Sequence, residues 1–356
     1  MVDAANAQSG NPWTRAANSN PVVEFIDNVL RGSGQVIFMN NPLTGLLNFI
    51  AMFVGAYNGG TSYAVAIGSV IGTIASTAMA YIMNSNRDNL RAGIYGFNGM
   101  LVGACLPTFL QVNALMWVFV VVGSMFSTLV IMAVGNFLTP YKMPAFTFPF
   151  VLICWIIVAF SYKVGGLNTG GLAPAMLTDY TAQEGVMQAG DFIKAGLTSM
   201  SQVWFVADWM AGIIFIVALL VESFWCAGLS ALGAFLGPVI AYLCGASVAD
   251  INFGLWGFTA ALTAPAVGCV FLQTNAKNVA LAVFSIFATL SMLEFKQMGV
   301  GLAAAVLIDA TIVRGVLVPA SMKLLGKWNW YLPAWLEWLP KLNLEGTPEP
   351  APRPAV

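Results

Sequence analysis

The chain has 356 residues, of which 59% are apolar and only 8% are charged. A soluble globular domain carries about 25% charged residues, so the composition excludes a soluble enzyme and predicts an all-α membrane protein. The formal net charge of −1 and the absence of histidine exclude a nucleic-acid-binding surface, a histidine-based catalytic triad and a histidine-ligated metal.

The N-terminal segment, residues 1–21, is polar and rich in Asn, Ser and Ala. It lacks the apolar core of a cleaved signal peptide. The pattern from Val22 to Leu30 then predicts a short amphipathic helix at the membrane surface.

About ten apolar segments follow, each near the ~20 residues that a membrane-spanning helix needs. We expect a first transmembrane repeat over 22–163, a Gly-rich loop over 164–190 and a second transmembrane repeat over 191–322. An interfacial Trp-rich segment and a Pro-rich tail cover 323–356. The predicted spans are 42–56, 61–83, 94–110, 114–138, 144–162, 210–226, 229–244, 255–271, 279–293 and 299–317.

The cysteines lie in apolar stretches and form no CxxC pair; they are Cys105, Cys154, Cys226, Cys244 and Cys269. This placement is typical of small buried residues and not of a metal site or a disulfide framework. We therefore expect no bound metal, no cofactor and no catalytic residue.

Two blocks of sequence recur along the chain. The first contains Gln35, Val36, Phe38 and Gly45, which recur at one constant spacing as Gln202, Val203, Phe205 and Gly212. The second block, from Gly93 to Phe97, recurs at a slightly shorter spacing from Gly254 to Phe258. Two copies with five spans each enter the membrane in opposite directions. The repeat therefore predicts two inverted-topology halves with the substrate path at their interface.

The repeated glutamines, Gln35 and Gln202, are the first candidates for a binding role. An uncharged amide inside a membrane must find hydrogen-bond partners, and the alternative role is to hold neighbouring helices together. We favour a binding site, because both glutamines recur with their neighbours. An amide carbonyl accepts N–H groups and its NH2 group donates to carbonyls, a combination that suits a neutral, planar, polar solute.

The repeated aromatic residues predict a narrow slot. Phe38, Phe205 and Phe258 would flank a flat solute with their ring faces, while Leu101 and its equivalent Leu262 would close the slot. Packing alone is the alternative interpretation of each aromatic residue.

The segment KMPAFTFPF, residues 142–150, contains two prolines, Pro144 and Pro149. Prolines at a helix start free backbone carbonyls, which a membrane tolerates only inside protein or along a wet cavity. Thr147 would add a hydroxyl to such a line of acceptors, and a simple proline kink is the alternative.

The segment from Asn41 to Gly45 predicts the capped start of a short helix. Asp208 takes the place of Asn41 in the second half. A carboxylate inside a membrane indicates a functional site, but Asp208 can also serve as a simple helix cap.

Five motifs resemble the urea transporter family of passive urea channels, over about residues 22–275. They are QVIFMNNPLTG at 35–45, GIYGFNGMLVG at 93–103, MPAFTFPF at 143–150, QVWF at 202–205 and GLWGFTAAL at 254–262. The resemblance implies two inverted five-span halves, each with a half-spanning pore helix, and a homotrimer with one pore per subunit.

The resemblance also implies roles for single residues. Gln35 and Gln202 would hydrogen-bond urea near the two pore mouths, with Val36 and Val203 beside them. Phe38 and an aromatic residue of the second half would stack on the solute. Thr147 would line the constricted centre.

Residues from about 283 to 340 depart from this family and make the second repeat atypical. The run GLAAAVLIDATIVRGVLVPASMKLLGKWNWYLPAWLEWLP resembles the C-terminal end of mycobacterial-type lipid exporters of the resistance-nodulation-division superfamily. Asp309 and Arg314 can pair in this segment, and Thr311 is the nearest substitute for a second central threonine. The sequence therefore has the character of a chimera.

We expect passive, channel-like permeation of urea by a multi-pass protein of the cell inner membrane or plasma membrane, with the lipid bilayer and sister subunits as its partners. The sequence carries no nucleotide-binding P-loop and no cluster of intramembrane carboxylates that would couple transport to ions. The alternatives are a proton-coupled exporter, to which Asp309 points, and a non-transporting membrane scaffold.

Overall fold

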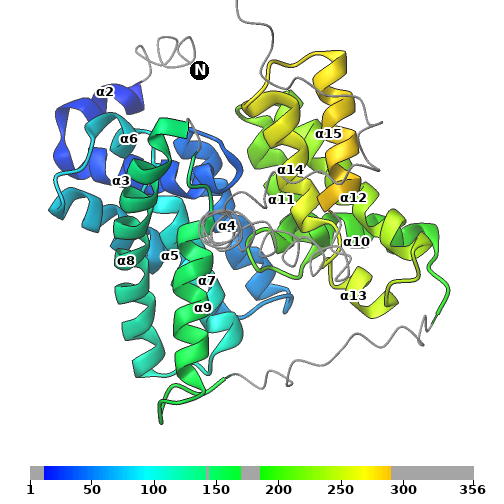
Figure 1. Ribbon diagram of the computed structural model, residues 1–356, viewed down its shortest axis with the longest axis horizontal. Coiled ribbons are helices and arrows are strands. Elements are labelled where there is room, and N and C mark those ends of the chain that lie inside the picture. Colours follow the sequence, from blue (N-terminus) through cyan, green and yellow to red (C-terminus); the bar gives the residue numbers. More distant parts are fainter. Residues whose placement is uncertain (1–11, 142–143, 170–184, 290–356) are drawn as a thin grey trace, which may run out of the picture. The chain divides into compact units, whose positions relative to one another are not determined.

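A computed structural model describes residues 12–141, 144–169 and 185–289 (Figure 1). These ranges belong to one compact unit, which reaches Ser291. The predicted span 299–317, the segment 323–356, and Asp309, Thr311 and Arg314 lie outside the described residues.

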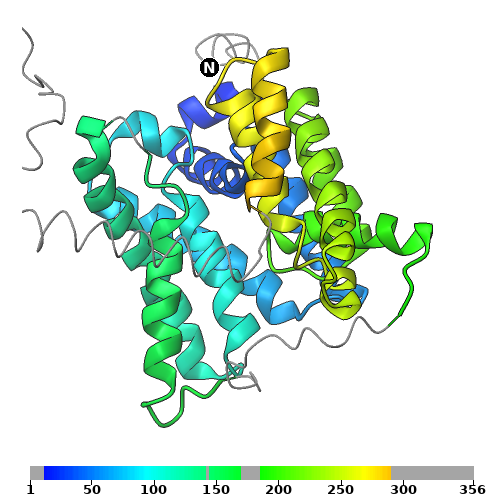
Figure 2. The ribbon, with the colours of Figure 1, turned by 45° about the vertical axis from the view of Figure 1, so that its right-hand side comes forward.

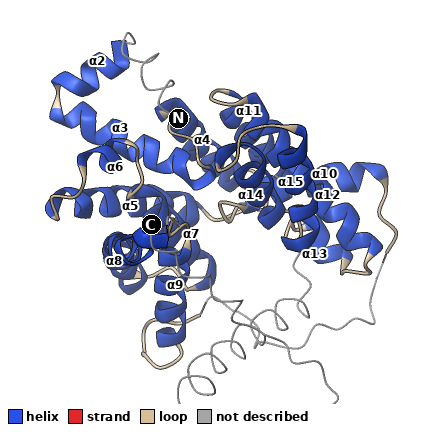
Figure 3. Ribbon diagram, turned by 45° about the horizontal axis from the view of Figure 1, so that its top comes forward, coloured by secondary structure: helices blue, strands red, loops and turns tan. Residues whose placement is uncertain are grey.

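The described ranges are helical, as Figure 3 shows, and their one β-bridge joins Leu110 to Thr169. The all-α fold class is therefore confirmed. The helices up to residue 161 are α2 (Pro12–Ser19), α3 (Pro21–Gly34), η2 (Gln35–Ile37), α4 (Pro42–Tyr57), α5 (Tyr63–Ile82), α6 (Arg87–Arg91), α7 (Gly96–Phe109), α8 (Ala114–Leu138), η3 (Thr139–Tyr141) and α9 (Phe148–Ser161).

The second group of helices begins after residue 185. They are α10 (Ala189–Gln202), α11 (Trp209–Leu220), α12 (Phe224–Leu243), α13 (Val248–Asn252), α14 (Phe258–Pro265), the π-helical turn η4 (Ala266–Val270) and α15 (Ala276–Thr289). The helices α14 and α15 pack side by side (Figure 2).

Polar side chains cap the starts of the apolar helices. The Asn41 side chain accepts the N–H of Leu43 at the start of α4, and the Ser62 side chain caps α5. The Asn113 side chain accepts the N–H of Met116 at the start of α8. Such caps satisfy N–H groups that have no partner within the helix, which matters most where water is excluded.

Nine of the ten predicted spans overlap a described helix. By length and composition, three helices of the described residues can cross a membrane, namely α5, α8 and α12. A fourth candidate is the pair formed by Pro21–Ile37 and Pro42–Tyr57, which is bent by 74°. The other apolar helices have 16 residues or fewer, about 24 Å at most, so they are shorter than the ~30 Å hydrocarbon core.

Several predicted boundaries were wrong. The amphipathic helix is longer than predicted, because α3 continues to Gly34 and is buried in its last turn. The break between the predicted spans 210–226 and 229–244 lies earlier, since Ser223 caps α12 by accepting the N–H of Cys226. The span predicted over 144–162 becomes helical only at Phe148, after Phe146 adopts the left-handed conformation.

The backbone repeats as well as the sequence. The helices α3 and α4 correspond to α10 and α11, while α5, α6 and α7 correspond to α12, α13 and the α14–η4 segment. A Cβ added at Gly45 would overlap the carbonyl oxygen of Leu30, and one added at Gly212 would overlap that of Leu197. The two halves therefore use the same glycine to let a short helix cross its predecessor closely.

Candidate functional site

A tight turn follows α3 and α10, and it carries the candidate residues of each half. The backbone N–H of Phe38 donates to the carbonyl of Gln35, and the N–H of Phe205 donates to that of Gln202. Both phenylalanines are left-handed, with φ of 66° and 61°. Positive φ is uncommon for a non-glycine residue and is often found at functional sites.

The two turns also share one pattern of burial. Val36 and Val203 are buried, whereas the glutamine before and the phenylalanine two positions after each valine are half-buried. The valines therefore anchor the turns in the core, and the residues around them remain accessible.

The two glutamine side chains are held by equivalent backbone carbonyls. The Gln35 Nε2 donates to the Ala92 carbonyl over 2.8 Å, and the Gln202 Nε2 donates to the Phe253 carbonyl over 2.8 Å. Ala92 and Phe253 directly precede the two copies of the second repeated block, so they are equivalent positions. Because each NH2 group is engaged, each amide oxygen is the part of the side chain that remains to accept a donor.

Aromatic contacts connect each turn to the other half. The Phe38 ring meets the Phe271 ring edge-on at 5.6 Å, and Phe271 meets Phe146 at 5.2 Å. In the opposite direction, Phe205 meets Phe109 at 6.2 Å and Phe150 at 6.3 Å. Such reciprocal contacts are expected where two similar halves face each other across a pseudo-two-fold axis.

One apolar cluster unites the predicted apolar site residues of both halves. Val36, Leu101 and Val203 are buried members of this cluster. The partly buried residues that pack against it include Phe38, Phe205, Phe258 and Leu262.

Thr147 lies at the start of α9 and is half-buried, and its hydroxyl does not cap the helix. Its position is set by Asn98 of α7, a fully buried residue. The Asn98 Nδ2 donates to the Phe146 carbonyl over 3.2 Å, and its Oδ1 accepts the N–H of Phe150 over 3.1 Å. The Asn98 amide thus bridges the two ends of the turn that carries Thr147.

Asp208 serves as a helix cap. Its Oδ1 accepts the N–H of Ala211 over 2.7 Å and receives a second hydrogen bond from the Asn58 side chain. Helix capping therefore accounts for the Asp208 carboxylate, and a functional site is not needed to explain it.

The halves also meet along α4 and α11, which are equivalent helices. The Thr44 hydroxyl donates to the Ala218 carbonyl over 2.8 Å, and the Ala207 N–H after the second turn donates to the Gly60 carbonyl. Equivalent elements that pack against each other lie next to the pseudo-two-fold axis.

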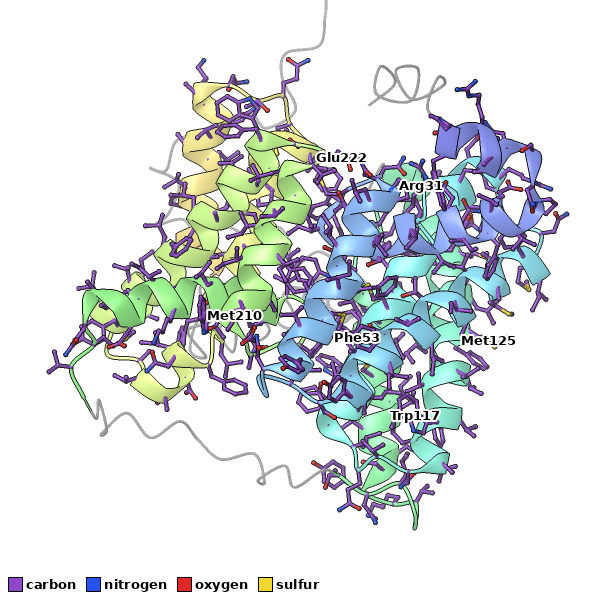
Figure 4. The ribbon with its side chains drawn as sticks, turned by 180° about the vertical axis from the view of Figure 1, so that it is seen from behind. Arg31, Phe53, Trp117, Met125, Met210 and Glu222 are labelled. Carbon is purple, nitrogen blue, oxygen red and sulfur yellow. The ribbon has the colours of Figure 1, made fainter. Side chains whose placement is uncertain are left out.

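A charged group holds the segment after the first turn. The Arg31 side chain pairs with Asp27 over 2.6 Å and donates to the backbone carbonyl of Asn40. Glu222, in the turn between α11 and α12, accepts the N–H of Asn40 and lies near Arg31 (Figure 4). Desolvation raises the pKa of Glu222, and the hydrogen bond from Asn40 and the nearby Arg31 oppose the rise.

Sequence reasoning missed four participants in this site. It did not identify the Ala92 and Phe253 carbonyls, because any residue can supply a carbonyl. Phe271 has no phenylalanine at the equivalent position of the first half, so the repeat gave no signal. Asn98 could have been found, since it lies inside the motif GIYGFNGMLVG as a buried amide in a helix.

A family model described as urea transporter matches residues 26–313, and so extends beyond about residue 275, where the resemblance was expected to end. Urea transporter 1 of Ovis aries is 29% identical over 285 residues, which cover 76% of this chain and 71% of that protein. Urea transporter 1 of Mus musculus is 28% identical over 278 residues, which cover 75% and 70%.

A second similarity is confined to a short part of the chain. The mycolic acid-containing lipids exporter MmpL11 of Mycolicibacterium smegmatis is 47% identical over 73 residues, which cover 20% of this chain and 8% of the exporter. Since the urea transporter model covers most of the chain, the chain belongs to the urea transporter family.

Proposed function

We propose that this chain is a urea transporter that lets urea permeate passively through a narrow slot between its two inverted halves. The reciprocal anchoring of Gln35 and Gln202 carries the proposal. Each side chain has its NH2 group held by a backbone carbonyl, so each presents an acceptor oxygen in a fixed direction. Urea has four N–H donors, which such acceptors can bind.

The rest of the slot replaces the hydration of urea. Ring faces of Phe38, Phe205 and Phe258 provide flat apolar walls, and the Thr147 hydroxyl adds a polar group between them. Selectivity then follows from slot width and from the match of donors and acceptors. Hydrated ions are excluded, because ring faces and neutral amides do not compensate the loss of their water.

Neither alternative is favoured. The exporter relative matches 8% of its own length, which is too little to bring an export mechanism to this chain. Among the described residues, the buried Asp27 is paired with Arg31 and Asp208 caps a helix, so neither is a free proton carrier. A family of transporters also implies a transporter and not an enzyme.

The multi-pass chain would reside in the cell inner membrane or plasma membrane as a homotrimer, with one slot in each subunit. The mass of the purified protein in detergent tests this assembly. A monomer that transports urea would contradict the trimer but not the slot.

The experiment that tests the function is stopped-flow urea efflux from proteoliposomes. Gln35→Ala removes the acceptor oxygen, and loss of one neutral hydrogen bond of about 1–1.5 kcal/mol predicts a roughly tenfold slower flux. A pH gradient should leave the flux of the wild type unchanged. Wild-type flux in Gln35→Ala would contradict the role of Gln35, and flux driven by a pH gradient would contradict passive permeation.

A further inference from the structure

Two cysteines of the second half touch through their sulfur atoms. The Sγ atoms of Cys226 and Cys269 are 2.7 Å apart. Cys226 lies in the first turn of α12 and is 5% exposed, whereas Cys269 lies in the π-helical turn η4 and is only half-buried. The sequence predicted small buried cysteines without a disulfide framework, and the pair therefore adds a feature that spacing along the chain did not reveal.

The pair is a departure from the internal repeat. At the spacing of the second repeated block, Val65 corresponds to Cys226 and Thr108 to Cys269. The Thr108 hydroxyl donates to the carbonyl of Ala104, and the Cys269 thiol donates in the same way to the carbonyl of Pro265. The fold is thus built with valine and threonine at these positions in one half, and the two thiols are not required for it.

The pair lies beside the candidate slot. Cys226 is a buried member of the apolar cluster that contains Val36 and Val203, and Cys269 packs against that cluster. Shortly after Cys269, the Phe271 N–H closes the π-helical turn by donating to the Ala266 carbonyl. The turn therefore holds the backbone of Phe271, whose ring meets the rings of Phe38 and Phe146.

We propose that Cys226 and Cys269 form a redox-active dithiol, which a peroxide oxidises to a disulfide that restrains the turn before Phe271 and slows urea permeation. The effect on flux rests on the proposed function, whereas formation of the disulfide does not.

The oxidation is balanced with hydrogen peroxide as the oxidant. The sulfur of one thiol attacks a peroxide oxygen, the O–O bond breaks, and a sulfenic acid and one water form. The second sulfur then attacks the sulfenic sulfur, the S–S bond forms and a second water leaves. Two thiols lose two hydrogens in total, and one peroxide molecule becomes two waters.

Exposure makes this pair the reactive one among the described cysteines. Cys154 is hydrogen-bonded to Cys105, but both are 4% exposed, so this pair has no member as accessible to peroxide as the half-buried Cys269. Cys244 is exposed, contrary to the prediction that the cysteines are buried, and no second cysteine is paired with it among the described residues. Replacing it by serine prevents links between chains.

The test uses the full chain with Cys244→Ser, reconstituted in liposomes, treated with hydrogen peroxide and then with dithiothreitol. Peptide mapping should detect a 226–269 link that is two hydrogen masses lighter than the free thiols. Urea efflux should fall several-fold and recover after reduction. The matched control is Cys226→Val together with Cys269→Thr, which copies the first half. This variant should pass urea as fast as the dithiol form of the protein, and peroxide should not slow it.

Each outcome has one consequence. Absence of the 226–269 link, an unchanged flux after the link has formed, or an equal response in the control variant would overturn the proposal. Reduced protein that folds but passes no urea would instead contradict the urea channel, and the peptide map alone would then decide whether the dithiol is oxidised.

Discussion

Replacing Asn98 by alanine should weaken both the fold and the passage of urea. Asn98 is fully buried, and its amide makes two hydrogen bonds of 3.2 and 3.1 Å to the ends of the turn that carries Thr147. Asn98→Ala leaves the Phe146 carbonyl and the Phe150 N–H without these partners. A buried polar group without a partner costs about 1–3 kcal/mol. Because both hydrogen bonds are only partly buried, we expect the free energy of unfolding to fall by about 2–4 kcal/mol, which is the lower part of the sum for two groups.

The same variant should reduce urea flux per folded molecule, because the turn no longer holds Thr147 in one position. The assay combines thermal unfolding in detergent with stopped-flow efflux, normalised to the folded protein recovered from the liposomes. Thr128→Ala is the matched control, since it removes one buried hydrogen bond, from the Thr128 hydroxyl to the Ser76 carbonyl between α8 and α5. It should lower stability by about 1 kcal/mol and leave the flux unchanged.

Two results would refute this reasoning. Wild-type stability in Asn98→Ala would mean that the two hydrogen bonds do not support the turn. Lower stability with an unchanged flux per folded molecule would mean that the turn does not need to be positioned for urea to pass.

Three further predictions concern other parts of the chain. Gln202→Ala should slow urea efflux as much as Gln35→Ala, because both amides are anchored alike, and a variant with wild-type flux would remove the second glutamine from the pathway. Gly212→Ala should prevent a monodisperse protein on size exclusion in detergent, since a Cβ there overlaps the carbonyl of Leu197; a normally folded variant would contradict this close crossing. Because desolvation raises the pKa of Glu222 from 4.5, the contribution of this carboxyl to stability is fully present below pH 4.5 and is lost as the pH rises through the raised pKa. Thermal unfolding at several pH values should show a smaller fall in Glu222→Gln, and an equal fall in both proteins would assign the effect to another group.

Most of the helices could be predicted because their signals are local. Apolar runs without charge, polar caps such as Asn41, Ser62 and Asn113, and prolines at helix starts all act within a few residues. The errors at boundaries arose where a side chain competes with the apolar pattern, as when Ser223 starts α12 earlier than hydropathy suggests.

The candidate residues of the site could be predicted because the chain repeats them. Gln35 and Gln202 recur with the same neighbours, and their turns have the same backbone conformation and burial. Where the halves differ, the repeat does not mark a residue as a candidate. The role of Phe271 and the Cys226–Cys269 contact were therefore not predicted.

The sequence by itself determined that this chain is a membrane protein with two related halves and a pair of repeated amides. Only the tertiary structure decided which backbone carbonyls accept hydrogen bonds from those amides and which residues meet across the halves. Gln35 reaches the carbonyl of Ala92, 57 residues away, and Thr44 reaches that of Ala218, 174 residues away. Every residue has a carbonyl, so composition cannot mark the one that will be close. That choice is made when the short helices cross and the halves pack together.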